Sequence, residues 1–257
     1  MTVRTADIDA LRSAYERVLD RIAAASARTG RDPASVTLVA VSKEVAGERV
    51  RDAVRAGIRV FGENRVQEAL AKQPEVDLPD LTWHLIGPLQ SNKARKAVDA
   101  FDVIETVDSV GLARRIDLIE TDIQEAHSVD PPWQMPVLLQ VNVDADPAKS
   151  GFKPDEVKAA LREIATLRHL RIDGLMTVGR FVTEAEDARS TFVALRDLSE
   201  RLRSKSDALG AELSMGMTDD FEVAVEEGAT IVRVGRAIFG ERPHHHGPEE
   251  PAHSHAR

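Results

Sequence analysis

Short apolar runs rich in β-branched residues alternate along the chain with charged segments of helical period. The eight runs span 36–43, 58–64, 82–90, 101–109, 136–144, 171–179, 212–218 and 230–240. Every run but the last precedes a predicted helix, for example at 47–56, 91–98, 109–126, 154–168, 184–209 and 219–228. Strands that are apolar throughout indicate a sheet covered on both faces. Their alternation with helices predicts that the strands pair in parallel.

Two architectures satisfy this pattern, a (β/α)8 barrel and an open doubly wound sheet. Eight strand–helix units within about 240 residues favour the barrel, whose usual length is about 250 residues. The open sheet would require a glycine fingerprint after the first strand, and "SKEVAGERV" has none. We therefore predict an α/β protein whose residues 1–242 form a single (β/α)8 TIM-type barrel.

Both ends of the chain lie outside the eight-unit pattern. Apolar residues at helical spacing over 7–29, ended by Gly30, predict an extra N-terminal helix that covers the barrel's bottom or mediates a dimer. Residues 243–257, rich in Pro, Gly, His and Glu, have little to bury, and we expect a disordered His-rich tail. Its histidines could ligate zinc, nickel or copper, but adventitious binding is the better interpretation, so we expect no metal site.

Composition restricts the partners. The net charge of −9 argues against nucleic acid or an anionic membrane surface as the main partner. The absence of cysteine excludes disulfides and thiolate metal sites. Because no stretch approaches the roughly 20 apolar residues of a spanning helix, and the N-terminus has no signal-type core, we expect a cytoplasmic protein.

The lysine that follows the first strand is the first candidate for chemistry. In a barrel the active residues lie at the carboxyl ends of the strands, and Lys43 comes directly after such an end. Desolvation there lowers the pKa of an amine and increases its nucleophilic neutral fraction. Such an amine can form a Schiff base with an aldehyde or ketone. The alternative, a lysine that reaches solvent or pairs with Glu44, is favoured by position alone.

Two glycine-bearing segments near the end of the chain are the second candidate. Gly216 could let the backbone approach a ligand, Thr218 with Asp219 could cap the next helix, and Gly235 follows the last strand. Barrels often bind phosphate at the loops after strands seven and eight. Together with the lysine, these segments suit an aldehyde that bears a phosphate. Pyridoxal 5'-phosphate (PLP) is the obvious candidate, and a phosphosugar aldolase is the competing one.

Several blocks of sequence also carry a family resemblance. The segments "VAVSKEV", "FGENRVQEA", "WHLIGPLQSNKARKA", "VNVDADPAKSGF", "GLMTVG" and "LSMGMTDDFEVAVEEGATIVRVGRAIFGER" resemble the pyridoxal-phosphate homeostasis proteins, which are PLP-binding proteins of fold type III. The resemblance runs from about residue 36 to 242. It implies a monomeric or weakly associating barrel like the N-terminal domain of alanine racemase, with PLP held as an internal aldimine and no established turnover.

The resemblance also implies roles for individual residues. Lys43 would be the Schiff-base lysine, Asn64 would lie near the ring or its phenolic oxygen, and His84 would form part of the pocket wall. Arg233 would face the pyridine nitrogen. The residues expected around the phosphate are Ser214, Gly216, Met217, Thr218, Gly235 and Arg236.

Two positions depart from the family pattern. Arg65 stands where many relatives carry tyrosine, and it could favour an anionic ligand or face solvent. Thr218 stands where many carry serine, and its hydroxyl should preserve phosphate binding.

The resemblance implies holding of the cofactor rather than turnover. An arginine at the pyridine nitrogen cannot accept a hydrogen bond from a protonated nitrogen. The nitrogen therefore stays neutral, and the ring is a weaker electron sink. Alanine racemase also needs a tyrosine from a second domain, whereas the only tyrosine here is Tyr15 in the N-terminal helix. The expectation is a non-catalytic protein of intracellular PLP homeostasis that delivers PLP through transient contact with apo PLP enzymes. The alternative is a weak PLP-dependent racemase or lyase that uses His84 as a base.

Overall fold

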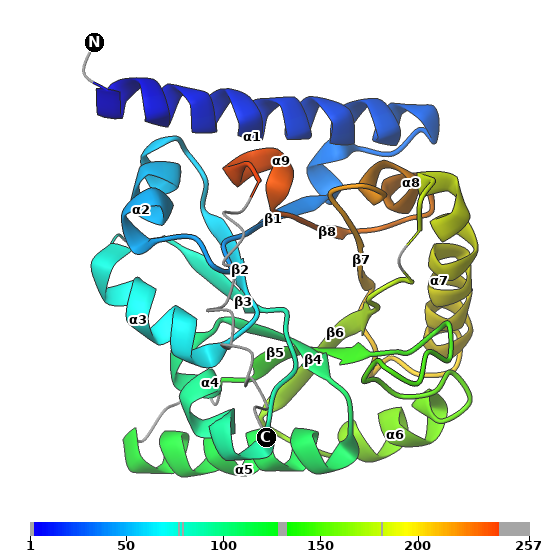
Figure 1. The fold of residues 1–257 in the computed structure, drawn as a ribbon. Coiled ribbons are helices and arrows are strands. Elements are labelled where there is room, and N and C mark those ends of the chain that lie inside the picture. The colour runs from blue at the N-terminus through cyan, green and yellow to red at the C-terminus, as the bar shows by residue number, and fades with distance from the viewer. Residues whose placement is uncertain (1–2, 77, 79, 128–132, 181, 242–257) are drawn as a thin grey trace, which may run out of the picture.

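A closed barrel of eight parallel strands forms the centre of the protein (Figure 1). The structure, a computed structural model, describes residues 3–76, 78, 80–127, 133–180 and 182–241. The strands follow one another around the barrel in chain order, and the first pairs with the last through registers such as Val39 with Arg233. The predicted (β/α)8 barrel is confirmed. The expected tail at 243–257 lies outside the described residues.

Each strand lies within, or within one residue of, a run that the hydrophobic pattern singled out. The strands are β1 (Thr37–Val41), β2 (Val60–Glu63), β3 (Thr82–Leu85), β4 (Val103–Val107), β5 (Met135–Gln140), β6 (Leu170–Met176), β7 (Glu212–Met217) and β8 (Ile231–Val234). Most of them end earlier than the runs, because the residues at the carboxyl ends turn outward into loops.

Helices surround the barrel. They are α1 (Val3–Arg28), α2 (Gly47–Arg55), α3 (Val66–Val76), α4 (Ala94–Ala100), α5 (Val110–His127), α6 (Val157–Ile164), α7 (Arg189–Arg203), α8 (Phe221–Glu226) and α9 (Arg236–Phe239). One expectation was wrong, since the whole run at 230–240 was predicted as a strand. β8 ends at Val234, and the segment from Arg236 forms α9, with Gly235 between them as its N-cap.

The extra N-terminal helix exists and lies along the outer ring of helices, beside α2, α8 and α9, rather than across an end of the barrel (Figure 1). Its stripe of Leu11, Val18 and Ile22 is buried against that ring. Arg21 adds two hydrogen bonds to Glu222 of α8, at 3.0 and 2.9 Å. The apolar stripe of α1 therefore covers the side of the barrel.

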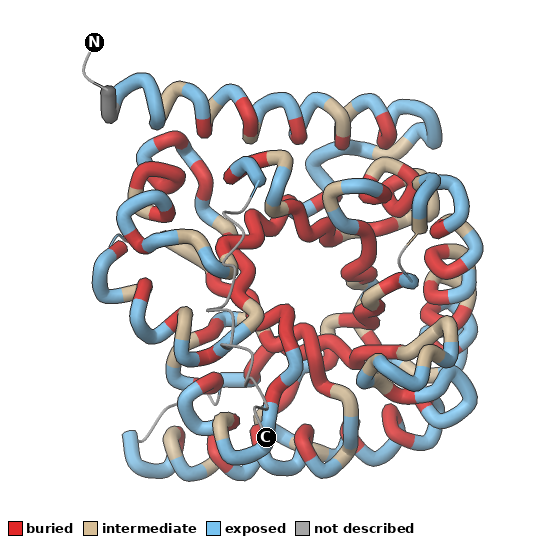
Figure 2. The backbone as a smooth tube through the Cα atoms, in the orientation of Figure 1, coloured by how far each residue is buried: buried red, intermediate tan, exposed pale blue. Residues whose placement is uncertain are grey.

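The buried residues form two layers (Figure 2). The larger layer lies between strands and helices, and a smaller cluster inside the barrel contains Val39, Leu138 and Met176. A Cβ on Gly62 would lie 2.7 Å from Cγ1 of Val39, so Gly62 faces the same interior. Since side chains alternate along a strand, Val39 and Val41 of β1 share the inward face, and Lys43 is next in that series.

Candidate functional site

Lys43 lies in a tight turn at the carboxyl end of β1, where its side chain is half-buried. The amide of Ser42 extends the ladder by donating to the carbonyl of Gly62 at 3.0 Å, and the amide of Val45 closes the turn on the carbonyl of Ser42 at 3.0 Å. Glu44 adopts a φ of 62°, in the left-handed region that non-glycine residues rarely occupy. The lysine therefore sits at the barrel mouth, as the sequence predicted, and its covalent role stays a prediction.

A buried ion pair lies beneath this turn. Nζ of Lys72, on α3, donates to the carbonyl of Ser42 at 2.6 Å and to Oε1 of Glu63 at 2.8 Å. The hydroxyl of Ser42 donates to the same Oε1 at 2.7 Å. Burial raises the pKa of Glu63, although the hydrogen bonds from Lys72 and Ser42 oppose the rise.

The pairing of Lys72 with Glu63 was not predicted from the sequence. The signal that could have found them is the position of Lys72 on α3, at the spacing of the buried Val66, Ala69 and Val76. A lysine on the apolar face of a helix needs a buried partner, and Glu63 at the end of the preceding strand supplies it.

A second buried network crosses the barrel interior. Nδ1 of His84 lies 2.6 Å from Oε1 of Glu105, and Ser214 donates to the other oxygen of Glu105 at 2.5 Å. Arg233 donates to the hydroxyl of Ser214 at 2.5 Å and to the carbonyl of Thr177 at 2.7 Å. Four strands, β3, β4, β7 and β8, thus contribute to one chain of polar contacts.

Charge compensation holds this network together. Burial raises the pKa of Glu105, but hydrogen bonding and the charge of His84, the Arg233 guanidinium and the Ser214 hydroxyl outweigh it, so the net shift is downward. Burial lowers the pKa of Arg233, while the charges of Glu105 and Asp220 raise it in part. Nη1 of Arg233 lies 3.8 Å from Oε2 of Glu105. Sequence reasoning missed Glu105, although a carboxylate inside an apolar strand, like Lys72 on its helix, indicates a buried charge partner.

The loops after β7 and β8 meet, as the phosphate hypothesis requires. The amide of Gly235 donates to the hydroxyl of Thr218 at 3.4 Å. Arg236 is exposed and pairs with Asp219. Met217 is 39% exposed. These residues are adjacent, but their contact with a phosphate stays a prediction.

One local interpretation of these loops was wrong, and a second residue there has a structural role that was not predicted. Thr218 and Asp219 do not cap α8, whose N-cap is Asp220; a carboxylate oxygen of Asp220 accepts the amide of Met217 at 2.6 Å. Gly216 has a φ of 91°, and a Cβ there would lie 2.5 Å from Cβ of Ala224. The missing side chain of Gly216 therefore makes room for α8, and the approach of a ligand to its backbone stays a prediction.

The loops after β2 and β3 also approach each other closely. Asn64 is half-buried directly after β2, and a Cβ on Gly87 would lie 2.2 Å from its carbonyl oxygen. The neighbouring Arg65 has a side chain that is 73% exposed and lies 3.7 Å from Glu68. Of the two alternatives for Arg65, the structure shows the solvent-facing one.

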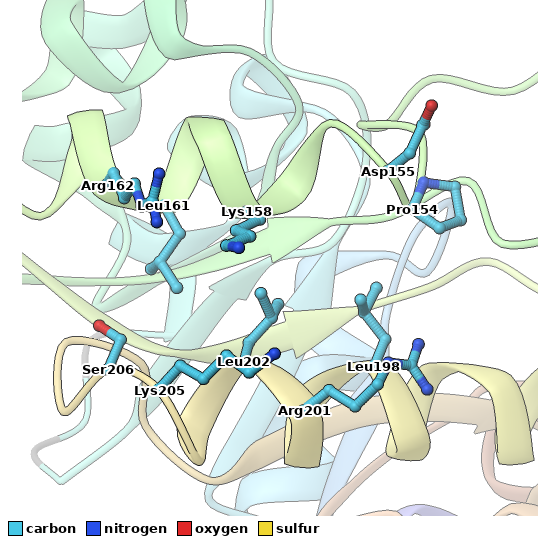
Figure 3. A pocket seen from close by; sticks show the side chains of 10 residues that line it. All are labelled: Pro154, Asp155, Lys158, Leu161, Arg162, Leu198, Arg201, Leu202, Lys205 and Ser206. Carbon is cyan, nitrogen blue, oxygen red and sulfur yellow. The ribbon is translucent and has the colours of Figure 1, made fainter.

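The predicted site residues lie in β3, β7 and β8 or in the segments that directly follow β1, β2, β7 and β8. Because parallel strands of a closed barrel end on the same face, these residues share that face. Figure 3 shows a different feature, a groove of about 380 Å³ between α6 and α7. Lys158, Arg162, Arg201 and Lys205 surround its leucine floor, and it includes none of the predicted site residues.

Two further features are absent from the described part of the chain, a metal-binding cluster and a membrane-spanning helix. Within it, no three or more His, Cys, Asp or Glu side chains gather in a way that could hold a metal ion. No helix within the same ranges is both long and apolar enough to cross a membrane.

The chain is similar to a known protein family. The family model of the alanine racemase N-terminal domain matches residues 14–243. The pyridoxal phosphate homeostasis protein of Pseudomonas aeruginosa is 43% identical over 227 residues, which cover 88% of this chain and 93% of that protein. The homologue of Escherichia coli K12 is 39% identical over 233 residues, covering 88% and 94% of the two chains.

Solved structures agree with these relatives. PipY of Synechococcus elongatus, solved with PLP bound, is 43% identical and has a TM-score of 0.74, covering 87% of this chain and all of PipY. An alanine racemase of Clostridium difficile covers 91% of this chain and 56% of its own length, with a TM-score of 0.66; at 17% identity it shows the fold alone. The chain belongs to the alanine racemase N-terminal domain family and, within it, to the pyridoxal phosphate homeostasis proteins.

Proposed function

We propose that this protein binds PLP through Lys43 and takes part in intracellular PLP homeostasis. The observation that carries the proposal is the half-buried Lys43 at the mouth of a barrel whose interior contains the buried network of His84, Glu105 and Arg233. The chain is also 43% identical to a protein solved with PLP. The amine of Lys43 adds to an aldehyde carbon and water leaves, so that a C=N bond joins the two. When bound, PLP supplies that aldehyde and an electron-accepting ring.

The residues present fit such a ligand. Thr218, Gly235 and Arg236 bring a hydroxyl, an amide and a guanidinium to the adjoining ends of β7 and β8, where a phosphate is expected. Asn64 adds an amide at the end of β2. These are the donor types that bind an anion. The proposed cofactor-binding set is Lys43, Asn64, His84, Ser214, Gly216, Met217, Thr218, Arg233, Gly235 and Arg236.

The proposed role is a carrier rather than an enzyme. Arg233 is buried and paired with Ser214, Thr177 and Glu105. Its guanidinium can donate a hydrogen bond to an unprotonated ring nitrogen but cannot accept one from a protonated nitrogen, so it favours the ring without that proton. A ring without that proton withdraws electrons weakly. Tyr15 cannot act as a second base at the mouth, because it lies on α1, outside the ring of helices.

One observation favours the alternative, a weak amino-acid racemase or lyase of the same fold type. Nδ1 of His84 is paired with the buried Glu105, which fixes the orientation of the imidazole. Exchange of the α-proton of L-amino acids in deuterated water distinguishes the two functions. The carrier predicts no sustained exchange, and enzyme-like rates that disappear in His84→Ala would establish the alternative.

Three further properties belong to the proposal. The protein is a monomer, resides in the cytoplasm and contacts apo PLP enzymes transiently, without a nucleic-acid or membrane partner. The net charge of −9 supports the exclusion of polyanionic surfaces. PLP should reach an apo enzyme faster when the loaded protein and the enzyme are mixed than when a dialysis membrane separates them. That result would support direct contact.

An absorbance titration tests the binding itself. Wild-type protein mixed with PLP should develop a visible band that borohydride abolishes, and Lys43→Ala should not develop it. Lys96→Ala, at an exposed lysine of α4, is the matched control and should behave as wild type. A wild-type protein that stays colourless with PLP would refute the proposed function.

A further inference from the structure

We infer that Lys72 is a positioning residue, which holds the turn bearing Lys43 in the geometry that its reaction with an aldehyde requires. The inference rests on the proposed function of Lys43 and extends it to a buried cation on a different element. Lys72 belongs to α3, is 8% exposed and lies outside the predicted binding set.

Both neighbours of Lys43 in the chain are tied to α3. On one side, the carbonyl of Ser42 accepts Nζ of Lys72 at 2.6 Å. On the other side, the amide of Glu44 donates to Oε2 of Glu68 at 3.0 Å. Nζ of Lys72 also lies 3.6 Å from that Oε2, so one ammonium connects the two attachments. We call Lys72, Glu63 and Glu68 the turn clamp.

The backbone of the turn needs such support. Residues 42–45 are closed by the bond from the amide of Val45 to the carbonyl of Ser42, with Glu44 at a φ of 62°. Turns with a positive φ at this position usually carry glycine there. A glutamate in that conformation is strained, and strain of this kind persists where the surroundings fix the backbone. The turn clamp provides that fixation on both sides of Lys43.

The clamp contacts the backbone beside Lys43 and leaves the loops after β7 and β8 untouched. Its loss should therefore weaken the covalent step more than non-covalent binding of the cofactor, since orientation errors of about 1 Å can reduce a reaction by 100-fold. A purely structural role would weaken both alike. The two effects separate when PLP is compared with 4-deoxypyridoxine 5'-phosphate, which has the ring and phosphate but no aldehyde.

The test uses the full-length double variant Lys72→Met/Glu63→Gln. The second substitution removes the carboxylate that would otherwise remain buried without its cation. We expect the equilibrium constant for the borohydride-trappable adduct to fall on the order of tenfold, with binding of the deoxy analogue unchanged. Glu120→Gln, which neutralises a buried carboxylate on α5, is the matched control and should change neither quantity.

A second variant protects the test against misfolding. Glu68→Ala removes the acceptor for the Glu44 amide at a partly exposed position and should weaken the adduct in the same selective way. The positioning role would be overturned if a folded variant lost affinity for PLP and for the deoxy analogue equally, or if neither variant lost any. Either result would leave the proposed PLP binding by the wild-type protein standing. If wild-type protein forms no adduct at Lys43, the proposed function itself fails, which is a distinguishable result.

Discussion

At the residue scale, single residues fix the geometry of the site, including a glycine, which has no side chain. Gly216 combines a φ of 91° with a close approach to Ala224 and Phe221 of α8, so two separate constraints require glycine there. The packing of Gly216 against α8 was not predicted, because a glycine's neighbours across the fold are not visible in the local pattern. Ser214 and Arg233 lie on the adjoining strands β7 and β8, and their roles toward the cofactor stay predictions.

Gly216→Ala should destabilise the protein by about 2–4 kcal/mol, since a left-handed backbone alone costs an alanine about 1–2 kcal/mol and the clash with α8 adds to it. Urea unfolding measures the change. Gly30→Ala separates the two costs, because Gly30 has a φ of 67° and no atom within 4 Å of an added Cβ. Equal losses at both positions would show that packing against α8 is not a constraint.

Glu105 should make stability depend on pH in the acid range. Its pKa is lowered in the folded state, so its stabilisation is complete above its unfolded pKa of about 4.3 and is lost as the pH falls through the folded pKa. The free energy of unfolding should therefore fall below about pH 4, and this component should be missing in Glu105→Gln. Urea unfolding from pH 3 to 6 measures it; identical slopes for variant and wild type would contradict the assignment.

At the element scale, the hydrophobic pattern was sufficient for the fold and insufficient for the details of its ends. Strands that are buried on both faces must be apolar throughout, so the continuous apolar runs and their alternation with helices predicted a parallel sheet. The eight strand–helix units then favoured the barrel. The N-terminal helix was predicted too, but its position beside α8 and α9 depends on long-range contacts such as that of Arg21 with Glu222. The short α9 was missed because its apolar residues continue the run of β8.

The packing of α1 gives a prediction at this scale. Leu11→Ala should cost about 2–5 kcal/mol, because the side chain is 1% exposed and its removal leaves a cavity beneath the helix. Leu19→Ala on the same helix is the control, since Leu19 is 38% exposed and should cost less than about 1 kcal/mol. Thermal unfolding of the two variants measures the difference, and a similar loss for both would mean that α1 does not rely on this face.

At the scale of the whole molecule, the barrel collects chemistry from distant parts of the chain onto one face. Lys43, Asn64 and Thr218 are brought to that face only because every parallel strand ends there. The pattern of strand ends predicted Lys43 and Thr218, and the family resemblance predicted Asn64. The sequence could not predict the buried networks below these residues. The pairing of Lys72 with Glu63, and of Glu105 with His84, depends on whether each strand side chain points toward the helices or into the barrel.

The most direct test of the central claim is the peptide map of protein reduced with borohydride in the presence of PLP. The account predicts one dominant phosphopyridoxyl group, on the peptide that contains Lys43, at about one equivalent per chain. A group spread over surface lysines, or concentrated on another lysine with Lys43 unmodified, would contradict it.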